Sequence, residues 1–409
     1  MQYRTMPNSD EKLSVLGYGC MRMPTKGRKS SIDVDEAKKQ ILYAIDNGVN
    51  YLDTAYPYHR GASESFLGEH ILKDGYREKV KVATKLPVFA INKTQKFDEI
   101  FFRQLEKLRI DYVDYYMLHA MEGSTWEKMK SLGIIDWMDE KRKQGKVKHM
   151  GFSYHGSYED FIKVVDEYNW DFVQVQYNIL DENLQAGIRG IEYAHSKGLG
   201  VIVMEPLKGG SLGGKVPKQI KEIYDSADVK RSAADWAMRW IYDNPAVTLI
   251  LSGMNDIGHI KENIETANSS LPGAMSKDER EMITRVKDKY IELMTVGCTG
   301  CGYCLPCPVG IDIPEAFKNL NNYHIFKKNS AKFFHISFSG IKTRDGKSHY
   351  AGSCIGCGEC EKKCPQNIEI RKELKRVSKD LETSILRSLA AVLRPVFGNK
   401  NRKQQSSSE

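Results

Sequence analysis

Cysteine is almost absent from the first 297 residues, where Cys20 is the only one, although the chain contains nine. The other eight lie in two short runs, CTGCGYCLPCP at 298–308 and CIGCGECEKKCP at 354–365. Cys20 falls on a predicted strand and is interpreted as a small buried apolar residue. The two runs therefore need a separate explanation from the rest of the chain.

The sequence also lacks any uninterrupted apolar run near the roughly 20 residues that a membrane-spanning helix needs. Its start, MQYRTMPNSDEK, has no apolar segment of the signal-peptide type. We therefore expect a cytoplasmic protein. Because intracellular thiols are kept reduced, the cysteine runs indicate metal binding or redox chemistry rather than disulfides.

No GxGxxG motif follows an early strand, which weighs against an open dinucleotide-binding sheet. Instead, short β-like runs alternate with longer helical patterns as far as about residue 270. The predicted strands are LSVLGYGCM near residue 17, YLDTA (51–55), KVKVATKL (79–86), YVDYYMLH (112–119), KHMGFS (148–153), DFVQVQY (171–177), GVIVME (200–205) and TLILSG (248–253). Eight strand–helix units with parallel crossovers predict an α/β fold, a (β/α)8 TIM barrel.

A chain of 409 residues exceeds the size at which one core keeps growing, so we predict more than one domain. The predicted domains are a barrel at 1–295, a small cysteine-rich domain at 296–380 and a flexible basic tail at 381–409. The front of the tail, SILRSLAAVLRPVF, has helical apolar spacing with arginines, which would also suit a membrane surface or a partner's groove. We favour a frayed or locally packed helix and expect no membrane contact of the tail.

Four polar residues fall at or just after the ends of consecutive predicted strands, where a barrel of this kind places its chemistry: Asp53, Tyr58, Lys85 and His119. Each alone has a structural interpretation, as a cap, a surface aromatic, a solvated charge or a core histidine. Together they are chemically complementary. The ammonium of Lys85 is expected to lower the pKa of the Tyr58 phenol, and Asp53 to hold Lys85 charged.

His119 would then hydrogen-bond a carbonyl oxygen on which negative charge develops. The set predicts reduction of a carbonyl, with hydride delivered to carbon and a proton from Tyr58 to oxygen.

The segments DTAYPYHRGASESFLG, VATKLP, YYMLHA, GFS, VQVQYN and ENIETA resemble, in order and spacing, the aldo-keto reductase superfamily over roughly residues 1–270. The resemblance implies a (β/α)8 barrel, NAD(P)H as cofactor, a small aldehyde or ketone substrate, and a catalytic tetrad of Asp53, Tyr58, Lys85 and His119.

The resemblance also implies cofactor-binding residues, which are Ser153, Gln174, Met204, Gly253, Glu262 and Asn263. Four positions depart from the family pattern. Tyr154 replaces an asparagine, Met204 in VMEPLKGG replaces an aromatic stacking residue, and Gly253 with His259 replaces basic residues of the phosphate-selecting forms. The choice between NADH and NADPH therefore stays open.

The second cysteine run has the spacing C-x2-C-x2-C-x3-C-P of bacterial ferredoxins, and the first has one residue fewer before its last cysteine. Eight thiolates match two 4Fe-4S clusters in a small α-helical ferredoxin-like domain. By analogy with two-cluster ferredoxins, one cluster is expected on Cys298, Cys301, Cys304 and Cys364, and the other on Cys354, Cys357, Cys360 and Cys307. Alternatives are a pairing in which each run holds its own cluster, and zinc.

Ferredoxin-like domains appended to such barrels resemble a subgroup of predicted oxidoreductases of anaerobes. Three hypotheses follow: a carbonyl reductase whose clusters exchange electrons with a partner or with the barrel site, a reductase whose clusters are structural or sense oxygen, and an electron-transfer or partner-binding module with a barrel that does not turn over. A net charge of +8 would suit an acidic carrier such as ferredoxin or flavodoxin. The aromatic and basic segment between the runs is interpreted as packing around the clusters, not as a nucleic-acid site.

Overall fold

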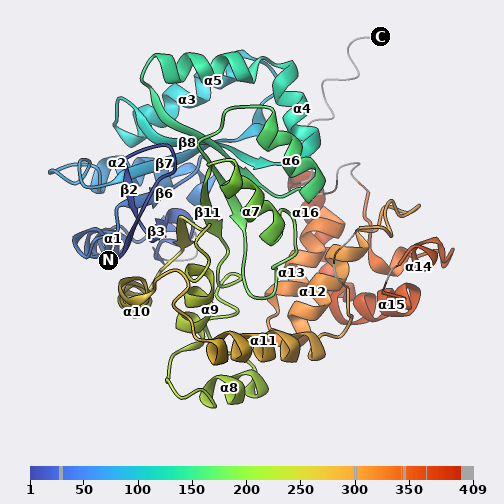
Figure 1. Ribbon diagram of the computed structural model, residues 1–409. Coiled ribbons are helices and arrows are strands. Elements are labelled where there is room, and N and C mark those ends of the chain that lie inside the picture. Colours follow the sequence, from blue (N-terminus) through green and yellow to red (C-terminus); the bar gives the residue numbers. More distant parts are fainter. Residues whose placement is uncertain are drawn as a thin grey trace, which may run out of the picture. The chain divides into compact units, whose positions relative to one another are not determined.

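The computed structural model describes residues 1–26, 31–298, 300, 302–341, 343, 347–364 and 366–397. The chain divides into two compact units, one of Met1–Lys215 and Tyr224–Thr284, the other of Val216–Ile223 and Arg285–Glu409 (Figure 1). The domain boundaries at residues 295 and 380 stay predictions.

A closed barrel of parallel strands forms the first unit (Figure 1). In chain order its eight strands are β3 (Leu16–Gly19), β6 (Tyr51–Asp53), β7 (Lys81–Leu86), β8 (Val113–Met121), β9 (Val147–Tyr154), β10 (Phe172–Gln176), β11 (Gly200–Met204) and β12 (Leu249–Ser252). Each matches a predicted strand, and β12 pairs with β3 to close the ring. The predicted TIM barrel is confirmed.

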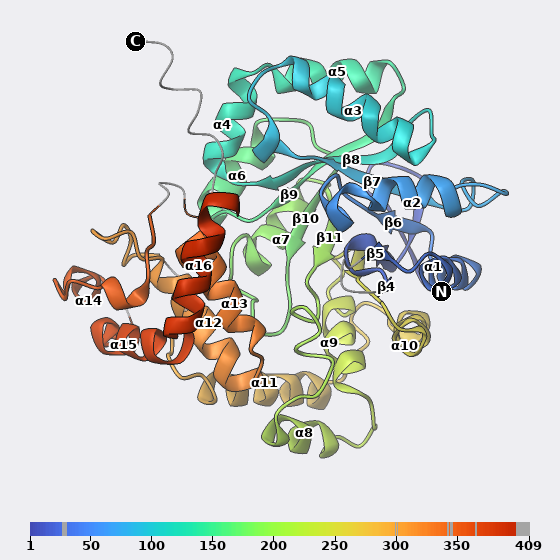
Figure 2. The same cartoon turned by 180° about the vertical axis from the view of Figure 1, so that it is seen from behind.

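Amphipathic helices surround the strands (Figures 1 and 2). They are α1 (Val34–Asp46), α2 (Ser63–His70), α3 (Gln95–Leu108), α4 (Gly123–Ser131), α5 (Ile134–Lys143), α6 (Tyr158–Asp166), α7 (Gly187–Ser196), α9 (Ala233–Tyr242) and α10 (Ile257–Ser269). Side chains of Asp33, Ser157 and Ser232 cap α1, α6 and α9 by accepting hydrogen bonds from backbone N–H groups of the first turn. Short 3-10 turns η1 (Cys20–Arg22), η2 (Tyr58–Gly61) and η3 (Val88–Ala90) follow β3, β6 and β7.

Two short hairpins were not predicted from the sequence. One joins β4 (Thr25–Lys26) to β5 (Ser31–Ile32), and the other joins β1 (Tyr3–Thr5) to β2 (Lys12–Ser14). The second hairpin buries Met6 and Leu13 in the same apolar cluster as interior residues of the barrel. It therefore covers the N-terminal ends of the strands.

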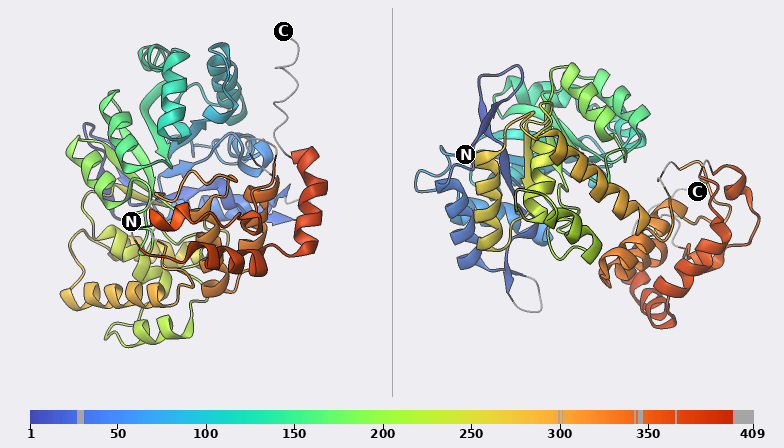
Figure 3. Two further views of the ribbon diagram at one scale, coloured as in Figure 1. Left: turned by 90° about the vertical axis from the view of Figure 1, so that its right-hand side faces the viewer. Right: turned by 60° about the horizontal axis from the view of Figure 1, so that its bottom comes forward.

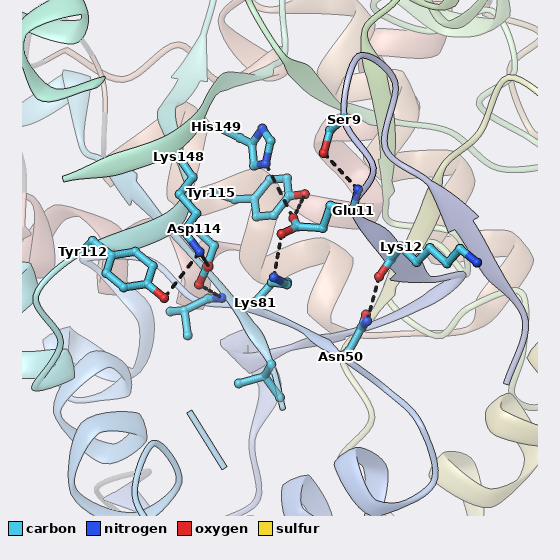
Figure 4. Close-up of polar contacts among 12 residues, drawn as sticks. Ser9, Glu11, Lys12, Asn50, Lys81, Tyr112, Asp114, Tyr115, Lys148 and His149 are labelled. Carbon is cyan, nitrogen blue, oxygen red and sulfur yellow. Dashed lines mark hydrogen bonds and ion pairs between the residues drawn. The ribbon is translucent and has the colours of Figure 1, made fainter. Parts of the chain in front are cut away.

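Glu11 fixes this hairpin to the barrel (Figure 4). Its carboxylate lies 2.6 Å from Nζ of Lys81 and 3.6 Å from Nε2 of His149, and it accepts a hydrogen bond from the Tyr115 hydroxyl. These partners lie on β7, β8 and β9, near the starts of those strands. Because this end is plugged, the C-terminal end of the strands is left for a site.

The second unit is helical and includes the cysteine runs. Its elements are α12 (Ile313–Phe326), α13 (Ser330–Ile336), the π-helical turn η4 (Ser337–Ile341), the 3-10 turn η5 (Ala351–Ser353), α14 (Glu359–Lys362), α15 (Ile370–Leu381) and α16 (Ser384–Phe397) (Figures 2 and 3). Helices α8 (Lys218–Asp225) and α11 (Lys277–Glu292) each contribute residues to both units. The core between α12 and α15 contains Ile313, Phe317, Leu320, Ile370, Leu374, Val377 and Leu381.

The first part of the predicted tail forms α16, whose Leu386, Ala390 and Leu393 pack with Ile336, Ile341 and Tyr350. Residues 398–409 lie outside the described residues. None of the helices in the described parts of the chain combines the length and the apolar character that crossing a bilayer requires.

Candidate active site and cluster site

The four polar residues predicted at the barrel mouth lie together. Asp53 ends β6, Lys85 is the penultimate residue of β7, His119 lies near the end of β8, and Tyr58 begins η2. Nζ of Lys85 lies 2.6 and 2.7 Å from the carboxylate oxygens of Asp53 and 5.0 Å from the centre of the Tyr58 ring. The Tyr58 and His119 ring centres are 6.1 Å apart with nearly perpendicular planes.

Lys85 is fully buried, and hydrogen bonds hold its ammonium group in place. Besides the two bonds to Asp53, it donates to the backbone oxygen of Thr54 at 2.7 Å. Burial alone would lower the pKa of Lys85, but the negative charge of Asp53 and the hydrogen bonds raise it above its ordinary value. Lys85 therefore acts on Tyr58 as a fixed positive charge.

The sequence-based expectation that the pKa of Tyr58 is lowered is wrong. Burial raises the pKa of Tyr58 by more than the nearby charge of Lys85 lowers it, so the pKa lies above the ordinary value. The expectation took account of the positive charge of Lys85 but not of the free-energy cost of burying a charged phenolate. The phenol is thus protonated at neutral pH and has a proton to donate.

His119 carries no charge at neutral pH. Burial, together with the charge of Lys85, lowers the pKa of the His119 imidazole to about 3. Its Nδ1 is buried and has no hydrogen-bond partner within the described part of the chain. The exposed ring of Phe89 lies 5.9 Å from the imidazole. A neutral imidazole at this place can donate a hydrogen bond and is a poor acid.

A buried polar network behind Lys85 was missed by the sequence analysis. Gln104 on α3 donates to the backbone oxygen of Lys85 at 3.0 Å and to Glu64 of α2 at 2.6 Å. Thr84 also donates to Glu64, and the Tyr116 hydroxyl donates to Gln104. Polar residues on the core-facing side of two helices are a signal that could have revealed it, since buried polar groups need partners.

Ser153 and Gln174 are direct neighbours in the register of β9 and β10. The Ser153 hydroxyl accepts from the N–H of Ala120 at 2.8 Å, and Ala120 has a left-handed φ of 58°. Oε1 of Gln174 is buried without a partner among the described residues, and its Nε2 faces the sulfur of Met204 at 3.6 Å. This spare acceptor and the free proton of a serine hydroxyl fit a carboxamide such as that of nicotinamide.

Tyr154, which replaces the family's asparagine, does not join this pair. Its hydroxyl donates instead to the backbone oxygen of Ser157 at 2.9 Å.

The remaining predicted cofactor residues lie at the end of β12 and on α10. Gly253 is exposed and Glu262 is half-buried. Asn263 is buried and donates to the hydroxyl of Ser252 at 3.0 Å. Its side-chain nitrogen is thus used within the fold.

The cysteines surround two cavities in the second unit. One cavity is lined by Cys304, Cys307, Cys354, Cys357 and Cys360, and the other by Cys298, Cys304 and Cys364. Cys307 of the first run thus lines the same cavity as Cys354, Cys357 and Cys360 of the second run. Cys364 of the second run lines the same cavity as Cys298 and Cys304 of the first run. Cys301 lies outside the described residues. Within the described ranges, no three His, Cys, Asp or Glu side chains converge as one metal ion would require.

The backbone around the cysteines fits a larger sulfide-containing group. Gly300 and Gly356 have φ values of 75° and 73° and occupy equivalent places in the two C-x-G-C-G-x-C segments. The N–H of Gly300 lies 3.4 Å from the sulfur of Cys298. Apolar Ile313 borders both cavities. Thiolate donors, an N–H group directed at a sulfur atom and an apolar wall suit iron–sulfur clusters.

Two protein families match the chain. The aldo/keto reductase family matches residues 15–284, and the 4Fe-4S dicluster domain matches residues 297–369. The two matches correspond to the barrel and to the segment containing the cavities.

Several known proteins are similar to more than half of the chain. Protein tas of Escherichia coli is 23% identical over 334 residues, covering 66% of this chain and 94% of that protein. The NADH-specific methylglyoxal reductase of Escherichia coli is 25% identical, covering 59% of this chain and 86% of that protein. The aldo-keto reductase AKR11C1 of Bacillus halodurans superposes with a TM-score of 0.58 at 23% identity, covering 70% of this chain and 96% of that one. The chain therefore belongs to the aldo/keto reductase family, as an oxidoreductase enzyme that carries a C-terminal 4Fe-4S dicluster domain.

Proposed function

We propose that the protein reduces the carbonyl group of a small aldehyde or ketone with NAD(P)H. The observation that carries this proposal is the convergence of Asp53, Lys85, Tyr58 and His119 at the C-terminal end of the barrel strands. A relative named for methylglyoxal reduction supports a small carbonyl compound as the substrate class.

When bound, a reduced nicotinamide would supply a hydride to the carbonyl carbon. Tyr58 donates its phenolic proton to the carbonyl oxygen, which completes the alcohol. The positive charge of Lys85 stabilises the phenolate that remains, and Asp53 keeps Lys85 charged and in place. Neutral His119 orients the carbonyl by donating a hydrogen bond to the same oxygen.

Ser153 and Gln174 are proposed to hold the nicotinamide carboxamide. The Ser153 hydroxyl would donate to the carboxamide oxygen, and Oε1 of Gln174 would accept from its NH2 group. Met204, whose sulfur contacts Gln174, would pack on the ring where relatives use an aromatic residue.

We further propose two 4Fe-4S clusters that pass electrons. Cys298, Cys301, Cys304 and Cys364 would hold one, and Cys354, Cys357, Cys360 and Cys307 the other. The cavity linings support the exchange of Cys307 and Cys364 between the runs, while Cys304 lines both cavities. Each cluster passes single electrons, so the clusters would serve exchange with a one-electron carrier.

The outward face of α15 supports an acidic carrier such as ferredoxin or flavodoxin. This face exposes four basic residues, Lys372, Lys375, Arg376 and Lys379, and the exposed Arg371 lies beside them at the edge of the cavity that Cys354 lines. On the other side of the helix, Leu374 borders that cavity and Ile370 borders the cavity that Cys298 lines. A basic face beside a cluster attracts an acidic protein and brings it close enough to exchange electrons.

Replacing Tyr58 with Phe tests the reductase proposal. We expect the rate of NAD(P)H-dependent reduction of simple aldehydes to fall by a factor of about 10² to 10⁴, because the proton donor is lost while the ring remains. Tyr3→Phe, which removes an exposed hydroxyl bonded to Gly48, is the matched control and should leave the rate unchanged. Full activity of the Tyr58→Phe enzyme would contradict the proposal.

A further inference from the structure

The two cysteine runs and the segments that follow them are two copies of one pattern. The matching stretches are C-x-G-C-G-x-C at 298–304 and 354–360, and CPVGIDIP at 307–314 with CPQNIEIR at 364–371. The structure repeats with the sequence, since helices α12 and α15 begin at the matching residues Ile313 and Ile370. Each position beside one cavity can therefore be compared with its counterpart beside the other.

The second residues of these two helices match in position but differ in charge. Arg371 of α15 lines the cavity that Cys354 lines, which we call the Cys354 cavity. The matching residue of α12, Pro314, lines the cavity that Cys298 lines, which we call the Cys298 cavity. Among the residues that the structure describes, the lining of the Cys298 cavity includes no acidic or basic residue. The repeat therefore places an arginine beside one cavity only.

The guanidinium of Arg371 lies close to the backbone between two cysteines. Gly358 stands between Cys357 and Cys360 in the sequence. A Cβ atom placed on Gly358 would lie 3.7 Å from Cζ of Arg371 and 3.8 Å from its Nη1. A Cβ atom placed on the matching Gly302 would have no atom of the described residues within 4 Å. The positive charge is thus held near the cysteine loop in one copy of the repeat.

Glu361 holds Arg371 in this place. Its carboxylate lies 2.7 Å from Nη2 of Arg371, accepts from Nε at 2.9 Å and accepts from the backbone N–H of Arg371 at 2.8 Å. Such a two-pronged pair fixes the direction of a guanidinium. Glu361 does not line the cavity, so the arginine is the nearer charge of the pair. The other charged lining residues, Lys363 and Glu359, are opposite in sign.

We propose that Arg371 makes the cluster of the Cys354 cavity easier to reduce than the cluster of the Cys298 cavity. This inference rests on the two clusters of the proposed function. Reduction adds one electron and therefore one negative charge, which a fixed cation nearby stabilises. The electron comes from a reduced one-electron carrier, which is oxidised by that electron, and no proton or bond changes hands. At equilibrium the first electron therefore rests in the Cys354 cavity.

An anaerobic redox titration followed by EPR, with small mediators and no carrier protein, measures the two midpoint potentials. We expect Arg371→Met to lower only the higher potential. The equilibrium constant for reduction should fall by about threefold to tenfold, which is about 28 to 59 mV for one electron. Arg371→Lys should recover part of this shift, because it keeps the charge but not the fork of donors.

Arg376→Met is the matched control. Arg376 is also on α15, its side chain is as exposed as that of Arg371, and it too pairs with a glutamate, Glu373. It lines neither cavity. Both midpoint potentials should therefore stay at their wild-type values in this variant.

Two further variants should shift a potential upwards. Glu361→Gln removes the negative partner of Arg371 and should raise the higher potential. Pro314→Arg places a cation at the matching position of α12 and should raise only the lower potential. If Arg371→Met loses a cluster, as iron and sulfide analysis would show, these two variants decide the question.

Equal potentials of the two clusters in the wild type overturn the inference and leave the proposed clusters standing. The same holds if Arg371→Met keeps both clusters and leaves both potentials unchanged, or lowers both equally. A wild-type chain that holds no 4Fe-4S cluster when prepared anaerobically overturns the proposed clusters, and the inference with them.

Discussion

Nε2 of His335 lies 2.8 Å from Oε1 of Glu382, and both side chains are buried. The same carboxylate accepts from the backbone N–H groups of Ala351 and Gly352, at 2.5 and 3.1 Å, and from Arg387 at 2.6 Å. Ala351 and Gly352 belong to η5, which leads directly into Cys354. Glu382 therefore anchors the backbone from which the second cysteine run begins.

Glu382→Gln should loosen this anchor. Removing one charge from a buried, hydrogen-bonded group costs about 3–5 kcal/mol, and here the cost falls on the segment before Cys354. We expect chelator to bleach the cluster absorbance several times faster than in the wild type. Glu369→Gln, which affects an exposed carboxylate paired with Lys372, is the control. Equal bleaching rates for Glu382→Gln and the wild type would show that the anchor does not support the cluster site.

The lowered pKa of Glu11 predicts that part of the stability of the barrel is lost in acid. Burial alone would raise its pKa, but hydrogen bonds with His149, Lys81 and Tyr115 lower it from 4.5 to about 2. Because the folded pKa is the lower one, the stabilisation is present above pH 4.5 and is lost as the pH falls from 4.5 towards 2. Allowing for partial exposure, we expect about 2 kcal/mol.

Urea unfolding of the wild type and Glu11→Gln measures this component. All five tryptophans lie between residues 126 and 240, so their fluorescence reports on the barrel unit. The stability difference between the two proteins should be largest near pH 7 and should shrink below pH 4.5. Glu78→Gln, at an exposed position, is the control. A difference that does not change with pH would contradict the assigned role of Glu11.

The barrel could be predicted because its signals are local. Each strand is a short apolar run between helical patterns, as in GVIVM of β11, which is buried along almost its whole length. The β1–β2 hairpin has only three residues in each strand. It is stabilised by the packing of Met6 and Leu13 with residues from Tyr51 onward and by the contact of Glu11 with Lys81, which no local pattern reports.

The places of the candidate-site residues could be predicted from the sequence, but the direction of the Tyr58 pKa shift could not. Asp53, Lys85 and His119 could be placed because they sit at or near the ends of predicted strands. The direction of the Tyr58 pKa shift depends on how deeply the phenol is buried, which the sequence does not state.

Cysteine substitutions can decide how the two runs are paired. When Cys354, Cys357 and Cys360 are all changed to Ser, the cluster on Cys298, Cys301, Cys304 and Cys364 should remain. On this background, adding Cys364→Ser should abolish the remaining cluster, whereas adding Cys307→Ser should leave it intact. Iron analysis and EPR of the reduced protein, prepared anaerobically, measure the outcome. The opposite pattern would show that each run holds its own cluster.

The basic face of α15 predicts electrostatic docking of an acidic carrier. Lys375 and Lys379 have no ion-pair partner among the residues the structure describes, whereas Arg371, Lys372 and Arg376 are paired with glutamates. Lys375→Glu and Lys379→Glu should therefore slow cluster reduction by reduced flavodoxin or ferredoxin, by about tenfold together at low ionic strength, and flatten its salt dependence. The measurement is stopped-flow absorbance at several salt concentrations.

Two controls separate docking from damage to the clusters. Lys277→Glu, at an exposed lysine of α11, reverses a charge outside this face and should have little effect. Reduction by a small uncharged photoreductant should be the same in all variants, because it needs no docking surface. If the wild-type rate with the protein carrier does not vary with ionic strength, the face of α15 is merely solvated and attracts no acidic partner, since a charge-steered encounter must weaken as salt screens it.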